Sequence, residues 1–375
     1  MKSKKVEHRD KHARVDISTI GSTRKLIISG IENQRWINKI VLRFMSENTP
    51  GIDTKLIGIN TDAHSRHHEF RVLGLGGLGC SIVNNLMSAE PDEIKSIACD
   101  ADAICLEHMR AHSHVLLSSR SPKVSGAQGL PNFGRLAALE NKDNIIPVVQ
   151  GTDVLFLIAG MGGSTATNAA PVMAKLARKA GTLVIAIVTK PFSFEGPERN
   201  HIAEQGIKEL IAATDTTIVI PNDRLLSRVE HAAGSSNAFN AVEPLLTDLV
   251  KQATIVLYHT LKHPLICFVI EDLEEVLGNA GRACIGMGRA EGSTCTFDAA
   301  RAAIKDTLID MPLSKATRIQ IILYVGRDSI GGDMRRAMDE IAGAVNPEAD
   351  IMTGTALNTD AADYSECTLI AGGFQ

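Results

Sequence analysis

The sequence predicts an α/β fold, with a doubly wound parallel sheet, then a long central helix and a smaller α+β domain. Nearly continuous apolar runs at 152–160 and 182–192 are typical of strands that are covered on both faces of a parallel sheet. Segments with helical spacing alternate with these strands, as in doubly wound folds. After His263 and Pro264 helices and strands are mixed, which indicates a second domain of the α+β class.

The elements of the first domain follow from the periodicity of apolar residues. A strand at 70–77 runs into a glycine turn, and a helix at 78–89 and a strand at 94–100 come next. A second strand and glycine turn occupy 152–165. The remaining pattern predicts a helix at 169–180, a strand at 182–192, a helix at 198–213 and a strand at 216–223.

A long helical stretch covers 237–262, with Pro244 near its start or at a kink, because proline is not tolerated inside a straight helix. This central helix separates a first domain at 71–236 from a second domain at 263–375. In the second domain we expect helices at 271–280, 297–306 and 333–343 and strands at 318–326, 349–355 and 364–373.

Two further segments precede the first domain. Residues 1–20 are predicted to be a disordered basic tail, and residues 21–70 an additional βαβ-like extension with strands at 25–31 and 53–59 around a helix at 33–46. Its segment IGINTDA (57–63) resembles SIACDADA (96–103) in the placement of a carboxylate after a strand. A degenerate internal repeat and a chance similarity between two βαβ units both stay open.

Composition excludes several classes of function. Lys and Arg number 39 and Asp and Glu 43, so no strong positive field is present to hold nucleic acid. No apolar run approaches the roughly 20 residues of a membrane span, so we expect a cytoplasmic protein without direct membrane insertion. The seven scattered cysteines lack a C-x-x-C pair, which predicts reduced thiols and no metal site.

Two glycine-rich turns are candidate anion-binding segments. GLGGLGCS (74–81) and GMGGSTATNAAP (160–171) each join a strand to a helix, where backbone N–H groups and the helix N-terminus attract an anion. Neighbouring strands of a parallel sheet would bring both turns to one polyphosphate at the carboxyl edge of the sheet. The first turn alone would also suit a dinucleotide-binding enzyme.

The order of several motifs resembles FtsZ, the tubulin-like cell-division GTPase family. After the two glycine turns come VTKPFSFEGPER (188–199) and IPNDRLL (220–226), strings that a dinucleotide enzyme does not explain. The resemblance continues through GRACIGMGRAEG (281–292) to CTLIAGGF (367–374). It implies a tubulin/FtsZ-like fold with a GTP-binding domain, GTP or GDP as ligand with Mg²⁺ beside the triphosphate, and head-to-tail self-association into filaments.

The resemblance also implies roles for individual residues. Glu195 and Arg199 match contacts to ribose and phosphate, Phe239 matches the residue that packs on guanine, and Glu243 takes the place of the Asp or Asn that accepts from the base. A carboxylate there would favour guanine over adenine. The implied nucleotide-binding set is Gly76, Gly77, Gly79, Cys80, Ser81, Asp102, Gly162, Gly163, Ser164, Thr165, Ala166, Thr167, Glu195, Arg199, Asn222, Phe239 and Glu243.

Departures from the family pattern predict weaker nucleotide binding. The family motif GGGTGTG reads GGSTATN here, so Ser164, Ala166 and Asn168 replace glycines and each adds a Cβ where phosphates approach the backbone. Ser81 replaces an asparagine that contacts guanine. Asp100 replaces the asparagine of an NTD motif and would repel a triphosphate unless Mg²⁺ intervenes.

The activating loop differs as well. In this family one subunit donates an N-x-D-x-x-D loop to the nucleotide of its neighbour, and its carboxylates orient the attacking water. Here Cys267 and Val269 stand in place of the asparagine and the first aspartate, while Asp272 is kept and Glu271 is adjacent. We therefore expect Asp272, with Glu271, to support slow or impaired hydrolysis completed between subunits.

Two functions stay open from the sequence. The first is a weak GTPase that forms filaments. The second is a pseudo-GTPase that regulates or copolymerises with another FtsZ. The chain ends at Gln375 directly after a predicted strand, without a linker and terminal peptide, which favours the second function.

Overall fold

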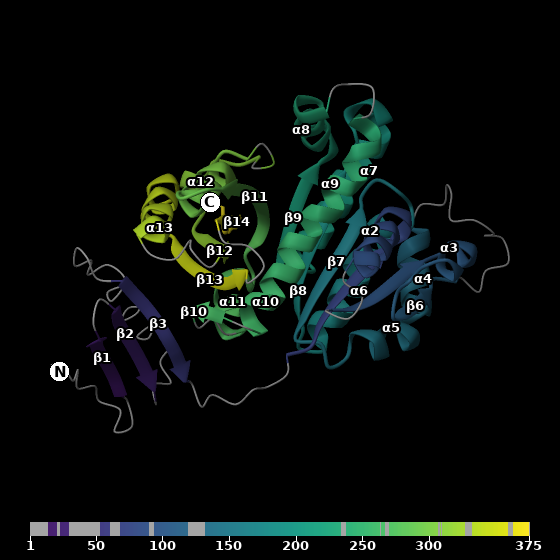
Figure 1. Ribbon diagram of the computed structural model, residues 1–375. Coiled ribbons are helices and arrows are strands. Elements are labelled where there is room, and N and C mark those ends of the chain that lie inside the picture. The colour runs from purple at the N-terminus through teal and green to yellow at the C-terminus, as the bar shows by residue number, and fades with distance from the viewer. Residues whose placement is uncertain are drawn as a thin grey trace.

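The described residues form two separate β-sheets. The computed structural model describes residues 14–20, 23–29, 53–60, 68–89, 94–118, 132–233, 238–262, 264–266, 270–306, 308, 310–326, 332–358 and 363–374. Within them, one sheet has three strands in the order β1-β2-β3. The other has eleven strands in the order β10-β13-β12-β14-β11-β9-β8-β7-β4-β5-β6 (Figure 1).

The small sheet consists of β1 (Arg14–Ile20), β2 (Thr23–Ser29) and β3 (Asp53–Asn60). Strands β1 and β2 are antiparallel, and β2 and β3 are parallel. The strands expected at 25–31 and 53–59 are confirmed, whereas residues 14–20, expected in a disordered tail, form β1. Paired backbone groups of β1 and β2 replace the solvated chain that the basic composition suggested. The expected helix at 33–46 and residues 1–13 lie outside the described residues.

The first half of the large sheet is entirely parallel. Its strands are β4 (Phe70–Leu75), β5 (Lys95–Asp100), β6 (Ser113–Leu116), β7 (Val154–Gly160), β8 (Leu183–Lys190) and β9 (Thr216–Pro221). Its helices are α2 (Gly76–Ala89), α3 (Ala103–Glu107), α4 (Phe133–Glu140), α5 (Lys142–Val149), α6 (Ala166–Lys179), α7 (Pro197–Ile211) and α8 (Asn222–Ala233), with a 3-10 turn η1 (Ser193–Glu195).

Helices cover both faces of this half, which makes it doubly wound. Successive residues of a strand point to opposite faces. Phe156 of β7 therefore packs in one core with α2 and the central helix, while Leu155 and Leu157 pack in a second core against α4, α5, α6 and α7. All three side chains are fully buried. Burial on both faces explains why β7 is apolar throughout.

The central helix joins the two halves of the molecule (Figure 1). It consists of α9 (Ala238–Lys251), a π-helical segment η2 (Gln252–Val256) and α10 (Leu257–Lys262). Leu246 and Leu249 share one hydrophobic core with strands of both halves. Pro244 lies early in α9, where fewer backbone N–H groups need an intrahelical partner.

The second half contains helices α11 (Ile270–Leu277), α12 (Cys295–Ile304) and α13 (Gly332–Ala344), with a 3-10 turn η3 (Leu313–Lys315). Its strands are β10 (Pro264–Ile266), β11 (Gly281–Glu291), β12 (Arg318–Gly326), β13 (Asp350–Asn358) and β14 (Tyr364–Gly372). The first residues of β11 pair in parallel with β9, and the rest pair antiparallel with β14. Strand β11 therefore connects the two halves into one sheet.

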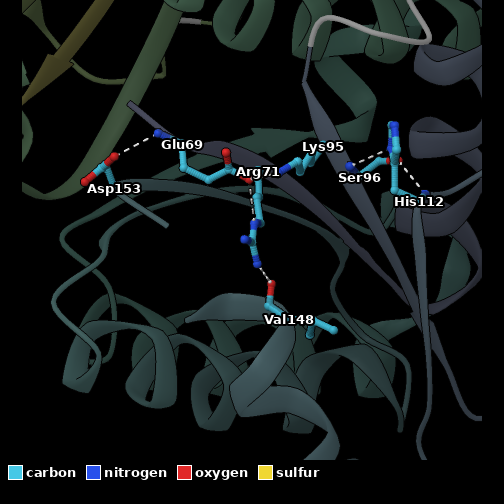
Figure 2. Close-up of polar contacts among 7 residues, drawn as sticks. All are labelled: Glu69, Arg71, Lys95, Ser96, His112, Val148 and Asp153. Atoms are coloured by element: carbon cyan, nitrogen blue, oxygen red, sulfur yellow. Dashed lines mark hydrogen bonds and ion pairs between the residues drawn. The ribbon is translucent and has the colours of Figure 1, made fainter. Parts of the chain in front are cut away.

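Polar contacts tie together the amino-terminal edge of the parallel half (Figure 2). The Glu69 N–H donates to Asp153 Oδ2 at 2.8 Å, and Lys95 Nζ lies 2.7 Å from Glu69 Oε1. Burial raises the pKa of Glu69, but Lys95 and Arg71 outweigh it and hold the pKa below its ordinary value. Arg71 also donates to the carbonyl of Val148. These contacts fix the chain where it enters β4.

The predicted fold class is confirmed, since a mostly parallel sheet with helices on both faces precedes a smaller mixed half. Several elements were not anticipated, namely β6, β10, β11, α3, α4, α5 and α8. Among the described residues, no helix has both the length and the apolar character of a bilayer-spanning segment.

Candidate nucleotide-binding site

Two helix N-termini meet at the carboxyl edge of the parallel half. Strand β4 ends at Leu75, and α2 begins at Gly76, whose φ of 71° suits glycine. Strand β7 leads through the second glycine turn into α6. A Cβ built on Gly76 would lie 3.0 Å from the Cβ of Ala166, the first residue of α6. The unpaired N–H groups of both helices therefore face a common region, which favours a polyanion.

The glycines of the first turn have different surroundings. A Cβ on Gly77 would meet nothing within 4 Å, so this position borders open space. A Cβ on Gly79 would lie 2.3 Å from the carbonyl oxygen of Ile158, which shows that Gly79 allows α2 to pack on β7. Cys80 is fully buried, and burial raises the pKa of its thiol to about 12. Of these residues, only Gly77 borders space that a phosphate would need.

Side chains of the second turn form hydrogen bonds with the backbone of the same turn. The N–H of Gly162, which has a φ of 105°, donates to Thr167 Oγ1 at 2.8 Å. Thr167 is 2% exposed, and its methyl group packs against Gly206 of α7 while its hydroxyl is engaged by Gly162. Asn168 Nδ2 donates to the carbonyl of Ser164 at 3.1 Å. Gly163 borders open space like Gly77.

The segment after β8 lies beside the second turn. A Cβ on Gly162 would lie 2.9 Å from Arg199 Cγ, which places the 195–199 segment next to the turn. Glu195 accepts from the N–H of Phe192 at 2.9 Å and pairs with Arg199 at 2.7 Å.

Asn222 begins α8, and its buried Oδ1 lacks a hydrogen-bond partner among the described residues. An unsatisfied buried acceptor fits a site that a ligand completes.

The α2 and α9 helices meet through a polar contact at the expected base end of the site. Ser81 Oγ donates to Glu243 Oε1, and Asn85 Nδ2 donates to the same oxygen at 3.3 Å. These donors orient the carboxylate while Oε2 is left for other donors. Phe239 belongs to α9, but its side chain lies outside the described part of the structure.

The carboxylates at the end of β5 and directly after it accept hydrogen bonds from the local backbone. Asp100 accepts from the N–H groups of Ala101 at 2.6 Å and Asp102 at 3.3 Å, and burial raises the pKa of its carboxyl. Asp102 is the N-cap of α3 and accepts from the N–H of Ile104 at 2.9 Å. Helix capping therefore explains the position of the Asp102 carboxylate without a bound ligand.

The two residues predicted to support hydrolysis lie far from these turns. Glu271 and Asp272 lie in the first turn of α11, beyond the end of the central helix that begins at Ala238 and carries Glu243 (Figure 1). The helical run from Ala238 to Lys262 is about 37 Å long from the rise per residue of an α-helix. Glu271 is exposed, whereas Asp272 is 8% exposed. Cys267 and Val269 lie outside the described residues.

Sequence reasoning missed one residue at the turns. Gly134, near the start of α4, donates its N–H to the Ser164 carbonyl at 3.3 Å. A Cβ at this position would lie 2.1 Å from the carbonyl oxygen of Thr165. The only signal in the sequence is a glycine within a short helix, which is weak because many glycines have no such role.

Parallel strands with two helix N-termini converging at their carboxyl edge define a nucleotide-binding α/β protein. The model of the Tubulin/FtsZ family, GTPase domain, matches residues 69–230, and that of the FtsZ family, C-terminal domain, matches residues 281–375. The cell division protein FtsZ of Pseudomonas putida is 33% identical over 81% of this chain and 76% of its own length. FtsZ 1 of Archaeoglobus fulgidus is 34% identical over 83% of each chain. The chain therefore belongs to the FtsZ family.

Solved structures agree with this assignment. An empty FtsZ dimer from M. jannaschii matches with a TM-score of 0.74 and 26% identity over 90% of this chain and 92% of that chain. CetZ2 from Haloferax volcanii, in a GTPγS-bound protofilament, matches with a TM-score of 0.67 and 17% identity over 82% of this chain and 93% of that chain. The second likeness concerns the fold alone.

Proposed function

We propose that this chain is a cytoskeletal protein that binds guanine nucleotide, assembles head to tail and hydrolyses GTP slowly between subunits. The observation that carries the proposal is the convergence of the α2 and α6 N-termini, with Gly76 and Ala166 in near contact. Two sets of helix-terminal N–H groups suit a phosphate chain better than one. Membership of a family whose domain is described as a GTPase supports the same ligand.

Guanine selection is assigned to Glu243. Its carboxylate is oriented by Ser81 and Asn85 and retains lone pairs for the N1 and N2 donors of guanine. Adenine presents an acceptor at the position of N1, so a carboxylate there would disfavour it. Phe239 is proposed to pack on the base.

Mg²⁺ is proposed to bind through phosphate oxygens. Among the described residues there is no cluster of three or more His, Cys, Asp or Glu that suits a metal ion. Mg²⁺ commonly keeps several waters and uses substrate phosphates with one or two carboxylates. The ion would also offset the charge of Asp100 next to a triphosphate.

Hydrolysis is proposed to need two subunits. The α11 carboxylates lie past the far end of a helix about 37 Å long, so one subunit does not bring them to its own nucleotide. A heterologous interface that repeats without closing would bring α11 of one subunit to the turns of the next. The solved FtsZ relative named as a dimer supports self-association. Exposed Glu271 is the more accessible carboxylate, while Asp272 is mostly enclosed.

A pseudo-GTPase that regulates or copolymerises with another FtsZ is the second candidate. It is favoured by Cys267 and Val269, because valine neither orients water nor coordinates a cation. Both candidates share nucleotide binding and differ in turnover. The cytoplasmic location stays a prediction for both.

Phosphate release from GTP with Mg²⁺, over a range of protein concentrations and with ATP as control, separates the candidates. We expect slow turnover per molecule that rises above a threshold concentration, because subunits complete one another's sites. Asp272→Ala should abolish turnover while leaving nucleotide affinity unchanged, and Glu271→Ala should reduce it. Absence of turnover at every concentration, with nucleotide still bound, would support the second candidate.

A further inference from the structure

The carbonyl of Ser164 in the second turn receives two hydrogen bonds. Asn168 Nδ2 donates to it from the first turn of α6 at 3.1 Å, and the Gly134 N–H donates from α4 at 3.3 Å. Helix α4 approaches so closely that a Cβ on Gly134 would lie 2.8 Å from this oxygen. The peptide between Ser164 and Thr165 is therefore held from two sides.

Holding this carbonyl also orients the next N–H group. A trans peptide is planar, so the Ser164 C=O and the Thr165 N–H point in opposite directions. With the carbonyl directed at α4, the Thr165 N–H is directed away from α4. Thr165 is the N-cap of α6, so the helix itself offers no acceptor for this N–H. The adjacent Ala166 faces Gly76 across the gap between the two turns.

We propose that Asn168 is a positioning residue for the phosphate chain. Its amide fixes the Ser164–Thr165 peptide so that the Thr165 N–H donates to a nucleotide phosphate. This inference rests on the proposed nucleotide binding. It reverses the expectation from the sequence, in which the Cβ of Asn168 obstructs the site that a glycine would leave open.

Three substitutions at this position distinguish positioning from obstruction. Asn168→Ala removes the donor and keeps the Cβ, Asn168→Gly removes both, and Asn168→Ser supplies a hydroxyl that reaches the carbonyl four residues earlier. The matched control is Asn141→Ala. Asn141 also donates its side-chain amide to a carbonyl four residues earlier, that of Ala137, but it lies between α4 and α5.

The experiment measures binding of fluorescent GDP and its competition by guanosine, together with the melting temperature without nucleotide. Asn168→Ala and Asn168→Gly should weaken GDP binding about 3- to 10-fold, the net value of one hydrogen bond. Asn168→Ser should stay within about twofold of the wild type. Guanosine lacks phosphates, so its affinity should not change in any variant. Asn141→Ala should lower the melting temperature without changing GDP affinity.

Three results would overturn the inference. Tighter GDP binding by Asn168→Gly would show obstruction. Unchanged GDP binding in the alanine and glycine variants would remove the positioning role, and equal weakening of guanosine and GDP would show a general structural defect. If Asn168→Ala does not fold, the serine and glycine variants decide alone. A wild-type protein that binds no guanine nucleotide would instead refute the proposed function itself.

Discussion

The first glycine turn yields a sharp prediction, because two of its glycines differ in what surrounds them. We compare Gly79→Ala with Gly77→Ala, two identical substitutions in the first turn of α2. A Cβ at Gly79 would lie 2.3 Å from the carbonyl oxygen of Ile158, whereas a Cβ at Gly77 would meet nothing within 4 Å. Gly79→Ala should therefore affect folding, and Gly77→Ala should affect ligand binding.

The expected magnitudes follow from these distances. Ordinary contacts of a Cβ begin at 3.4 Å, so α2 and β7 must separate by about 1 Å to accept Gly79→Ala. Overpacking against backbone, which does not rotate away, should cost about 3 kcal/mol of unfolding free energy. Gly77→Ala should leave stability unchanged or raise it by up to about 1 kcal/mol, because alanine favours helix. It should weaken GDP binding about tenfold or more by displacing a phosphate from a backbone N–H.

Urea unfolding without nucleotide measures the first effect, and titration of fluorescent GDP measures the second. Gly77→Ala should unfold at the same urea concentration as the wild type or a higher one, and Gly79→Ala should unfold at lower urea. Unchanged GDP affinity in Gly77→Ala would refute the phosphate role of this turn. Equal loss of stability in both variants would refute the distinction between them.

Three further predictions concern the base contact, the buried thiols and a partly buried ion pair. Glu243→Gln should weaken GTP binding about tenfold, since an amide N–H would face a donor of guanine, and fluorescent GTP titration measures this. Burial raises to about 12 the pKa values of three thiols, Cys80, Cys284 and Cys367. These thiols stay protonated in the folded chain and ionise in the unfolded chain above pH 9, so the free energy of unfolding should fall by about 1.4 kcal/mol per pH unit per thiol between pH 9 and 12. Urea midpoints at rising pH test this, and Cys284→Ala should reduce the slope by the contribution of one thiol, about 1.4 kcal/mol per pH unit. Asp215 is 7% exposed and pairs with Arg178 at 3.1 Å, so Asp215→Ala should cost about 2 to 3 kcal/mol in urea unfolding, whereas Arg335→Ala at an exposed pair should stay within about 0.5 kcal/mol. A smaller loss for Asp215→Ala than for Arg335→Ala would contradict that ranking.

Sequence periodicity predicted the elements whose environment is uniform along their length. Strands β7 and β8 are buried on both faces, so their apolar runs identify them directly. Strand β11 was not predicted because its environment changes along its length. It pairs in parallel with β9 at Gly281–Ala283 and antiparallel with β14 from Cys284 onward, and its last residues are exposed. Helix α5 contains Pro147, which obscures a helical pattern in so short a segment.

The position of the candidate site could be predicted from the sequence, whereas the roles of its individual residues could be predicted less well. Glycine turns after strands locate the carboxyl edge, because parallel strands align their carboxyl ends. The direction of a side chain depends on the neighbouring helix, which the sequence does not reveal. Thr167 illustrates this, since its methyl group packs on Gly206 of α7 and its hydroxyl accepts from the Gly162 N–H. Gly79 likewise serves the contact between α2 and β7.

Mixing two inactive variants tests the central claim that subunits complete one another's sites. Asp272→Ala retains the nucleotide turns, and Glu243→Ala retains α11, so each alone should release little phosphate from GTP. A mixture should regain activity at about a quarter of its interfaces, because random head-to-tail contacts pair an intact turn with an intact α11 at that frequency. Activity of the mixture equal to the sum of its separate components would contradict completion between subunits.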